Sequence, residues 1–163
     1  MIHACAHIPK NRGFTLIEVV IVVIVLAIAV PPTLNLMQSA ASGRADAINT
    51  TRATMLATAV MESVLADINS STEGLGFDAL ADPSVYLNNP DTGLVSRIER
   101  QVSPYTDAGF TYAVEISELV GINAVVTGDE AQDIFRVVTV SVTFPSASSA
   151  SYELPVSLLV SAL

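Results

Sequence analysis

Hydrophobic residues concentrate near the N-terminus, where residues 19–30 include no polar side chain. As a helix, residues 14–30 would be about 26 Å long at about 1.5 Å per residue, close to the ~30 Å hydrocarbon core of a bilayer. The pattern therefore predicts one membrane-embedded helix at the start of the chain.

Two consecutive prolines, Pro31 and Pro32, follow this apolar run. They remove two backbone donors and disfavour the helical conformation at the residue before them. We expect a kink or a short unwound segment here, with the helix resuming at Thr33. The alternative is that the membrane helix ends at the prolines.

Beyond the prolines the pattern is that of an amphipathic helix continuing to residue 72. Apolar residues recur at helical spacing and predict a side packed on a sheet: Ala41, Ala45, Ile48, Leu56, Val60, Val64 and Ile68. Charged residues are assigned to the opposite side: Arg44, Asp46, Arg52, Glu62 and Asp67. Gly74 and Gly76 predict that this helix ends just before them.

The last ninety or so residues alternate in the manner of β-strands after a turn-rich connection. Residues 73–109 predict an irregular segment with a short helix near 94–102. Period-two alternation over residues 110–117, 138–144 and 152–160 predicts antiparallel strands, with 119–127 as a candidate further strand interrupted by Gly121. Pro155 suits an edge or a bulge. The prediction is an α+β fold, a long N-terminal helix packed on a three- or four-stranded antiparallel sheet.

One carboxylate, Glu18, stands at the head of the apolar run. An acid at the centre of a membrane helix costs about 2.5 to 3.5 kcal/mol and needs a partner. Residues 14–43 contain no Lys, Arg or His, so this segment supplies no side-chain cation. Cleavage after Gly13 would create one, the α-amino group of Phe14, one helical turn before Glu18.

Residues 13–18, Gly-Phe-Thr-Leu-Ile-Glu, resemble the prepilin-type cleavage and methylation motif. Type IV pilins, minor pilins, competence pilins and type II secretion pseudopilins share it, and the resemblance covers residues 12–30. It implies that a prepilin peptidase cleaves between Gly13 and Phe14 and methylates the amine of Phe14. It also implies that Glu18 pairs with the terminal amine of a neighbouring subunit.

The resemblance further implies a pilin-like fold, with its kink at Pro31-Pro32, and a division of the chain. Residues 1–13 would be the leader, 14–37 the transmembrane and filament-core helix, 38–72 its amphipathic continuation, and 73–163 a globular head with a variable region and the sheet. An ordinary signal anchor explains the apolar run but not the Gly-Phe-Glu spacing.

The flanking charges predict topology. Lys10 and Arg12 precede the apolar run and Arg44 lies well beyond it, which favours a cytoplasmic N-terminus and an extracytoplasmic C-terminal domain. The expected location is a single pass of the inner (cytoplasmic) membrane, then a filament. The competing processing site is Ala27-Ile28-Ala29, where a signal peptidase would release a soluble protein.

The charge and the cysteine content narrow the class of protein that the sequence predicts. The formal net charge is −9, and removing the leader with Lys10 and Arg12 changes it to −11. Such an acidic chain is not expected to bind nucleic acid through a basic groove. The single cysteine, Cys5, lies in the leader, so the mature protein cannot form the C-terminal disulfide common in type IV pilins. The absence of this disulfide favours a minor pilin or a pseudopilin.

The sequence offers few candidate catalytic or metal-binding residues, and we do not expect this protein to be an enzyme. The two histidines, His3 and His7, also lie in the leader, which excludes His- or Cys-based nucleophilic and zinc sites from the mature chain. Glu99 and Glu118, or the acids within residues 129–133, could pair as acid and base, but solvated charges are the commoner explanation. Asp129, Glu130 and Asp133 are weak calcium candidates without EF-hand spacing. Otherwise no cofactor is expected.

The sequence thus predicts a structural subunit of a type IV pilus-like or type II secretion filament. Expected partners are a prepilin peptidase, other pilin or pseudopilin subunits, the inner-membrane assembly platform and membrane lipid. The alternatives are a monomeric membrane-anchored extracytoplasmic binding domain and a secreted hydrolase using carboxylates. The choice between pilus, competence and secretion systems stays open.

Overall fold

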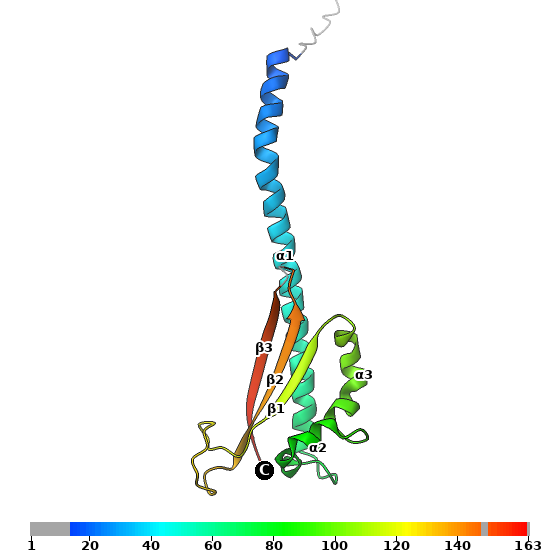
Figure 1. The fold of residues 1–163 in the computed structure, drawn as a ribbon, viewed down its shortest axis with the longest axis vertical. Helices are drawn as coiled ribbons and strands as arrows, with labels where there is room; N and C mark the ends of the chain where they lie inside the picture. Colours follow the sequence, from blue (N-terminus) through cyan, green and yellow to red (C-terminus); the bar gives the residue numbers. More distant parts are fainter. Residues whose placement is uncertain (1–13, 148–149, 163) are drawn as a thin grey trace, which may run out of the picture. The chain divides into compact units, whose positions relative to one another are not determined.

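The computed structural model describes residues 14–147 and 150–162, so Gly13 and the rest of the leader lie outside the described residues. The chain divides into two units, Met1–Ala41 and Ser42–Leu163, and their boundary falls within the first helix, α1 (Leu16–Ile68). Figure 1 shows α1 and the elements of the second unit.

In the first unit, α1 passes through Pro31 and Pro32 without an unwound segment or an end. The prolines leave carbonyls one turn earlier without their usual donors. Next to them, the hydroxyl of Thr33 donates to the carbonyls of Ala29 (3.2 Å) and Val30 (2.7 Å). A polar side chain in an apolar segment is thereby satisfied by its own helix. The kink stays a prediction.

In the second unit, α1 buries one side against the sheet and the shorter helices. The buried residues follow helical spacing: Ala53, Leu56, Ala57, Val60, Met61, Val64 and Asp67. Our assignment of faces was wrong at both ends of this stretch. Ala41, Ala45 and Ile48 are exposed, whereas Asp46 and Asp67 lie on the packed side. They lie seven residues from Ala53 and Val60, and seven residues are nearly two full turns.

The segment after α1 is more helical than its composition predicts. α1 ends at Ile68, before the predicted end at residue 72. A 3₁₀-helix, η1 (Phe77–Ala81), and a short helix, α2 (Pro83–Asn88), precede α3 (Leu94–Thr106). The side chain of Asp82 accepts from the backbone N–H groups of Ser84 and Val85 and so caps α2, with Pro83 in its first turn.

Three antiparallel strands form one sheet in the order β1 (Thr111–Ile116), β2 (Phe135–Pro145) and β3 (Ser151–Ser161). The α+β layout of a long helix on an antiparallel sheet is confirmed. The candidate strand at 119–127 is not formed: only Val120 makes a bridge, to Phe135. Pro155 lies in an edge strand, as predicted, opposite Ser141 of β2.

The core of the second unit lies between α1, α3 and one face of the sheet. Alternate residues of β2 are buried, namely Val138, Val140, Val142 and Phe144, and meet α1 residues such as Leu56 and Val60. Two polar contacts fix α1 to the β2–β3 connection: Asn49 donates to the carbonyl of Pro145 (2.9 Å), and Asp46 accepts from the N–H of Ala147 (2.9 Å).

Candidate functional site

The first turn of α1 is built by Thr15 and Glu18. α1 begins at Leu16, so Thr15 is the capping residue and Glu18 the third helical residue. The N–H of Glu18 lies 3.4 Å from the hydroxyl oxygen of Thr15 and 3.1 Å from its carbonyl oxygen. Thr-x-x-Glu is the capping-box pattern, and a negative charge here is favoured by the helix dipole. The motif therefore begins its own helix just after Phe14.

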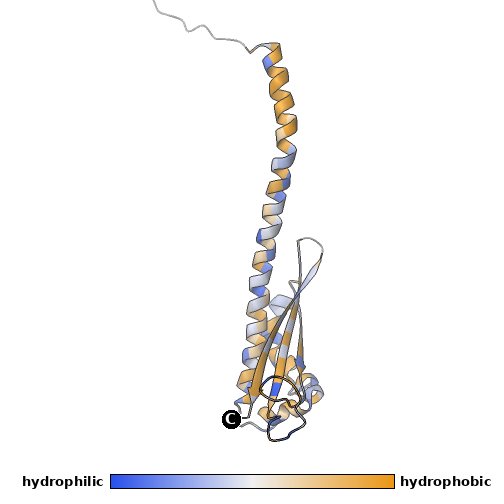
Figure 2. Cartoon of the chain, turned by 90° about the vertical axis from the view of Figure 1, so that its left-hand side faces the viewer, coloured by the Kyte–Doolittle hydropathy of each residue, from blue (hydrophilic) through white to orange (hydrophobic). Residues whose placement is uncertain are grey.

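The helix around Glu18 is apolar and uncovered. Figure 2 shows the hydrophobic colouring along its first half. The most hydrophobic window of α1 has a mean hydropathy of 2.6, and none of it is buried within the chain. By length and composition it is the one helix of the described residues that could cross a membrane. Phe14, Leu16 and Ile17 are each more than 60% exposed, so this surface needs lipid or other subunits to cover it.

Glu18 has no ionic partner in the part of the chain that the structure describes. Its side chain is exposed, and the ion pair of the described residues joins Asp67 and Arg97 instead. Because residues 14–43 lack a basic side chain, a partner within this segment is limited to an amino terminus at Phe14.

A buried polar cluster in the second unit escaped the sequence analysis. Arg97 of α3 binds Asp67 of α1 through two parallel hydrogen bonds of 2.6 Å, and the hydroxyl of Tyr86 in α2 donates to the same carboxylate at 2.6 Å. Arg97 also donates to the carbonyl of Thr92 (2.9 Å). The cluster joins three helices where the variable segment meets α1. The sequence did contain one indication that Asp67 is buried: it lies seven residues, nearly two helical turns, after Val60.

The weak calcium candidates lie in the β1–β2 loop, residues 117–134, but the carboxylates of Asp129 and Asp133 already accept hydrogen bonds. Asp133 accepts from the N–H and hydroxyl of Thr127 and from the N–H of Gly128, at 2.8 to 3.0 Å. Asp129 accepts from Ala131 and Gln132. Among the described residues no three acidic, His or Cys side chains are grouped to hold a metal ion. Calcium binding stays an untested prediction.

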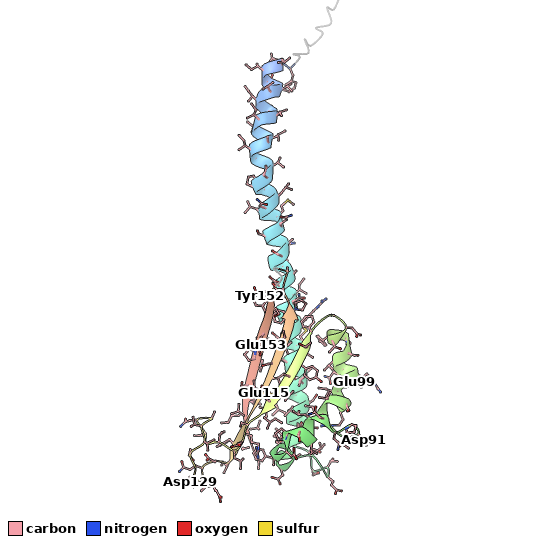
Figure 3. The ribbon with its side chains drawn as sticks, in the orientation of Figure 1. Asp91, Glu99, Glu115, Asp129, Tyr152 and Glu153 are labelled. Atoms are coloured by element: carbon pink, nitrogen blue, oxygen red, sulfur yellow. The ribbon has the colours of Figure 1, made fainter. Side chains whose placement is uncertain are left out.

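The candidate acid–base residues do not share a buried site. Glu99 is exposed on α3, and Glu118 is exposed after the end of β1. Figure 3 shows Glu99 on the outside of α3, with Asp129 on the distant β1–β2 loop.

Comparison with protein families supports the motif. Residues 8–30 match the family model of the prokaryotic N-terminal methylation motif, which spans both Gly13 and Glu18. No curated protein and no solved structure matches the chain. The motif and the long helix packed on an antiparallel sheet together support the resemblance to the type IV pilin-like and pseudopilin family.

Proposed function

We propose that this chain is a minor pilin or pseudopilin, a structural subunit of a type IV pilus-like or type II secretion filament. The observation that carries the proposal is the position of Glu18. Among the described residues it is a carboxylate without an ionic partner, in the first turn of an apolar, uncovered helix. It lies one helical turn after Phe14, the residue that cleavage would make the amino terminus.

Pairing Glu18 with the amine of Phe14 would satisfy both charges. Leaving one member of such a pair unpartnered in a low-dielectric setting costs about 3 kcal/mol or more. A contact within one chain would neutralise the charge, whereas a contact with the amine of the next subunit would also fix their axial register. Register is what a filament requires, so the contact between subunits is the one we propose.

Assembly then follows from the apolar helix. In the membrane its side chains are covered by lipid, with the N-terminus cytoplasmic and the second unit extracytoplasmic. A prepilin peptidase removes residues 1–13, the platform presents the subunit, and neighbouring helices replace the lipid. The chain acts by binding copies or relatives of itself and not as an enzyme.

Mass spectrometry of the mature N-terminus tests this proposal. We expect N-methyl-Phe14 as the first residue, both in membranes and in material sheared from the cell surface. A chain beginning after Ala29 would overturn the proposal, and a methylated chain found only in membranes would favour the monomeric anchored domain.

Substitution at the cleavage site provides the control. In Gly13→Val a branched side chain stands where the peptidase needs close access to the backbone, so we expect the leader to be retained. Ala29→Val alters the competing signal-peptidase site and should leave processing after Gly13 unchanged.

A further inference from the structure

The β1–β2 loop exposes more apolar surface than a solvated loop requires. Figure 1 shows it extending beyond the end of the strands. Five large apolar residues in it are 40 to 71% exposed: Leu119, Ile122, Val125, Val126 and Ile134. Hydrogen bonds from Thr127 and Gly128 to Asp133 hold the loop in a defined conformation. A fixed, exposed apolar patch of this kind marks an interaction site.

The loop is also uniformly acidic. Residues 117–134 contain Glu118, Asp129, Glu130 and Asp133 but no Lys or Arg. Asp129 and Asp133 serve hydrogen bonds within the loop, whereas the side chain of Glu130 has no partner among the described residues. The patch therefore fits a partner surface that is apolar with a basic side chain at its rim.

A surface of that description lies at the opposite end of β1. The groove lined by Arg52, Met55, Pro104, Tyr105, Ala108 and Phe110 has a volume of about 440 Å³, and we call it the Arg52 groove. Five of its six residues are apolar or aromatic. Arg52 is exposed and makes no ion pair in the part of the chain that the structure describes. Arg44, also exposed, lies about 12 Å from Arg52 along α1, toward the N-terminus.

One chain cannot bring its own loop into its own groove. The groove includes Phe110, just before β1, whereas the loop follows Ile116 at the end of β1. The six residues of β1 separate the two surfaces by roughly 20 Å. Two different, complementary surfaces at opposite ends of one unit produce a head-to-tail contact, which propagates instead of closing into a dimer.

We propose that the β1–β2 loop of one copy of this chain docks into the Arg52 groove of a second copy. The apolar tip around Val126 enters the groove, and Glu130 lies opposite Arg52. The inference rests on the proposed filament function, with this chain as a repeating pseudopilin or pilin subunit. It assigns a contact to the second unit that is separate from the contact of Glu18.

Disulfide trapping in the full chain tests the contact, because a disulfide forms only when the two Cα atoms approach within about 7 Å. Cys5 is the only native cysteine, so Cys5→Ser gives a cysteine-free background. In this background we combine Met55→Cys with Val126→Cys. The matched control is Val85→Cys with Val126→Cys, since Val85 and Met55 are both 57% exposed. Oxidised, sheared filaments of the first pair should give a ladder of multimers, and the control should stay monomeric.

Charge reversal provides the second measurement. Arg52→Glu and Glu130→Arg should each lower the cross-linked fraction of the Met55–Val126 pair several-fold, and the combination should restore it. A double variant no better than the single variants would overturn the assignment of this charge pair.

The outcomes separate this inference from the proposed function. If the cysteine variants enter filaments but give no ladder, head-to-tail docking is overturned and the filament subunit stands. If the Cys5→Ser background itself is absent from sheared material, the proposed function fails. A product joining this chain to another protein, or a dimer that extends no further, also overturns docking between copies.

Discussion

At the residue scale, Asp67 shows how one acidic side chain can organise the second unit. It is 6% exposed, yet it receives two hydrogen bonds from Arg97 and one from Tyr86, which together satisfy both carboxylate oxygens. Removing one partner of such a cluster costs more than the cluster contributes, because the remaining charge stays partly desolvated.

Asp67→Ala should therefore lower the free energy of unfolding by about 3 kcal/mol, the lower end of the usual range because Arg97 is 32% exposed and can reach water. Tyr86→Phe removes one hydrogen bond and should cost about 1 kcal/mol. Urea unfolding of the detergent-solubilised chain, followed by circular dichroism, measures both. Equal losses would show that the ion pair is not the dominant contact.

The same cluster predicts that the stability of the folded chain decreases at alkaline pH. Burial, then the hydrogen bond to Asp67, raises the pKa of Tyr86 above its ordinary value of 10.0. A raised pKa in the folded state means that the contribution of Tyr86 is complete below pH 10 and is lost as the pH rises further.

Between about pH 9 and about pH 11, the wild-type chain should lose more stability in urea than Tyr86→Phe does. Tyr112, whose pKa is also raised by burial, is present in both proteins and sets the common background. Parallel losses in the two proteins would contradict the role of Tyr86.

At the element scale, the β1–β2 loop depends on Asp133 for its conformation. Burial raises the pKa of Asp133, but hydrogen bonds from Thr127 and Gly128 outweigh that effect and lower it. The contribution of Asp133 is therefore present above its ordinary value of 3.8 and is lost as the pH falls below it.

Asp133→Ala should open the loop without unfolding the sheet. We expect faster protease cleavage between residues 122 and 131, with the global free energy of unfolding changed by no more than about 1 kcal/mol. Asp129→Ala, which removes contacts to Ala131 and Gln132 only, is the matched control and should change cleavage less. Unaltered cleavage in Asp133→Ala would show that other contacts hold the loop.

The elements also show what could be predicted from the sequence. The apolar run and the alternation in β1, β2 and β3 each dominate their segment, so α1 and the sheet were predictable. Residues 119–127 carry strand-like residues but bend around Gly121 and find no neighbouring strand beyond Val120. Helix η1 and helix α2 are shorter than any window in which periodicity is visible.

Within the candidate sites, the motif could be recognised from the sequence, whereas contacts between residues far apart in the chain could not. The span from Gly13 to Glu18 lies within one short stretch of sequence. The Asp67–Arg97 pair joins residues thirty positions apart, and the Arg52 groove joins α1 to the α3–β1 turn. Such contacts exist only once the chain has folded, so spacing alone does not reveal them.

At the scale of the whole molecule, the proposed function depends on what covers the apolar helix. Its most hydrophobic window is entirely unburied within the chain. The chain as a whole is acidic, with a formal charge of −9, or −11 once the proposed cleavage removes Lys10 and Arg12. Under the proposed function, lipid covers the helix in the membrane, and neighbouring helices replace the lipid in a filament. Glu18 is the group for which these two environments would differ most, since the proposed pairing with a neighbour's amine is available only after assembly.

Glu18→Ala tests this claim most directly. Loss of the acid should favour membrane residence, by less than the about 2.5 to 3.5 kcal/mol of a helix centre because Glu18 lies in the first turn, and should leave the chain inserted and cleaved. It leaves the Phe14 amine unpaired, at about 3 kcal/mol or more, so the ratio of subunit in sheared filaments to subunit in membranes should fall at least about tenfold. Glu62→Ala, at an exposed acid of α1 in the second unit, should keep the wild-type ratio. A wild-type ratio for Glu18→Ala would contradict the account.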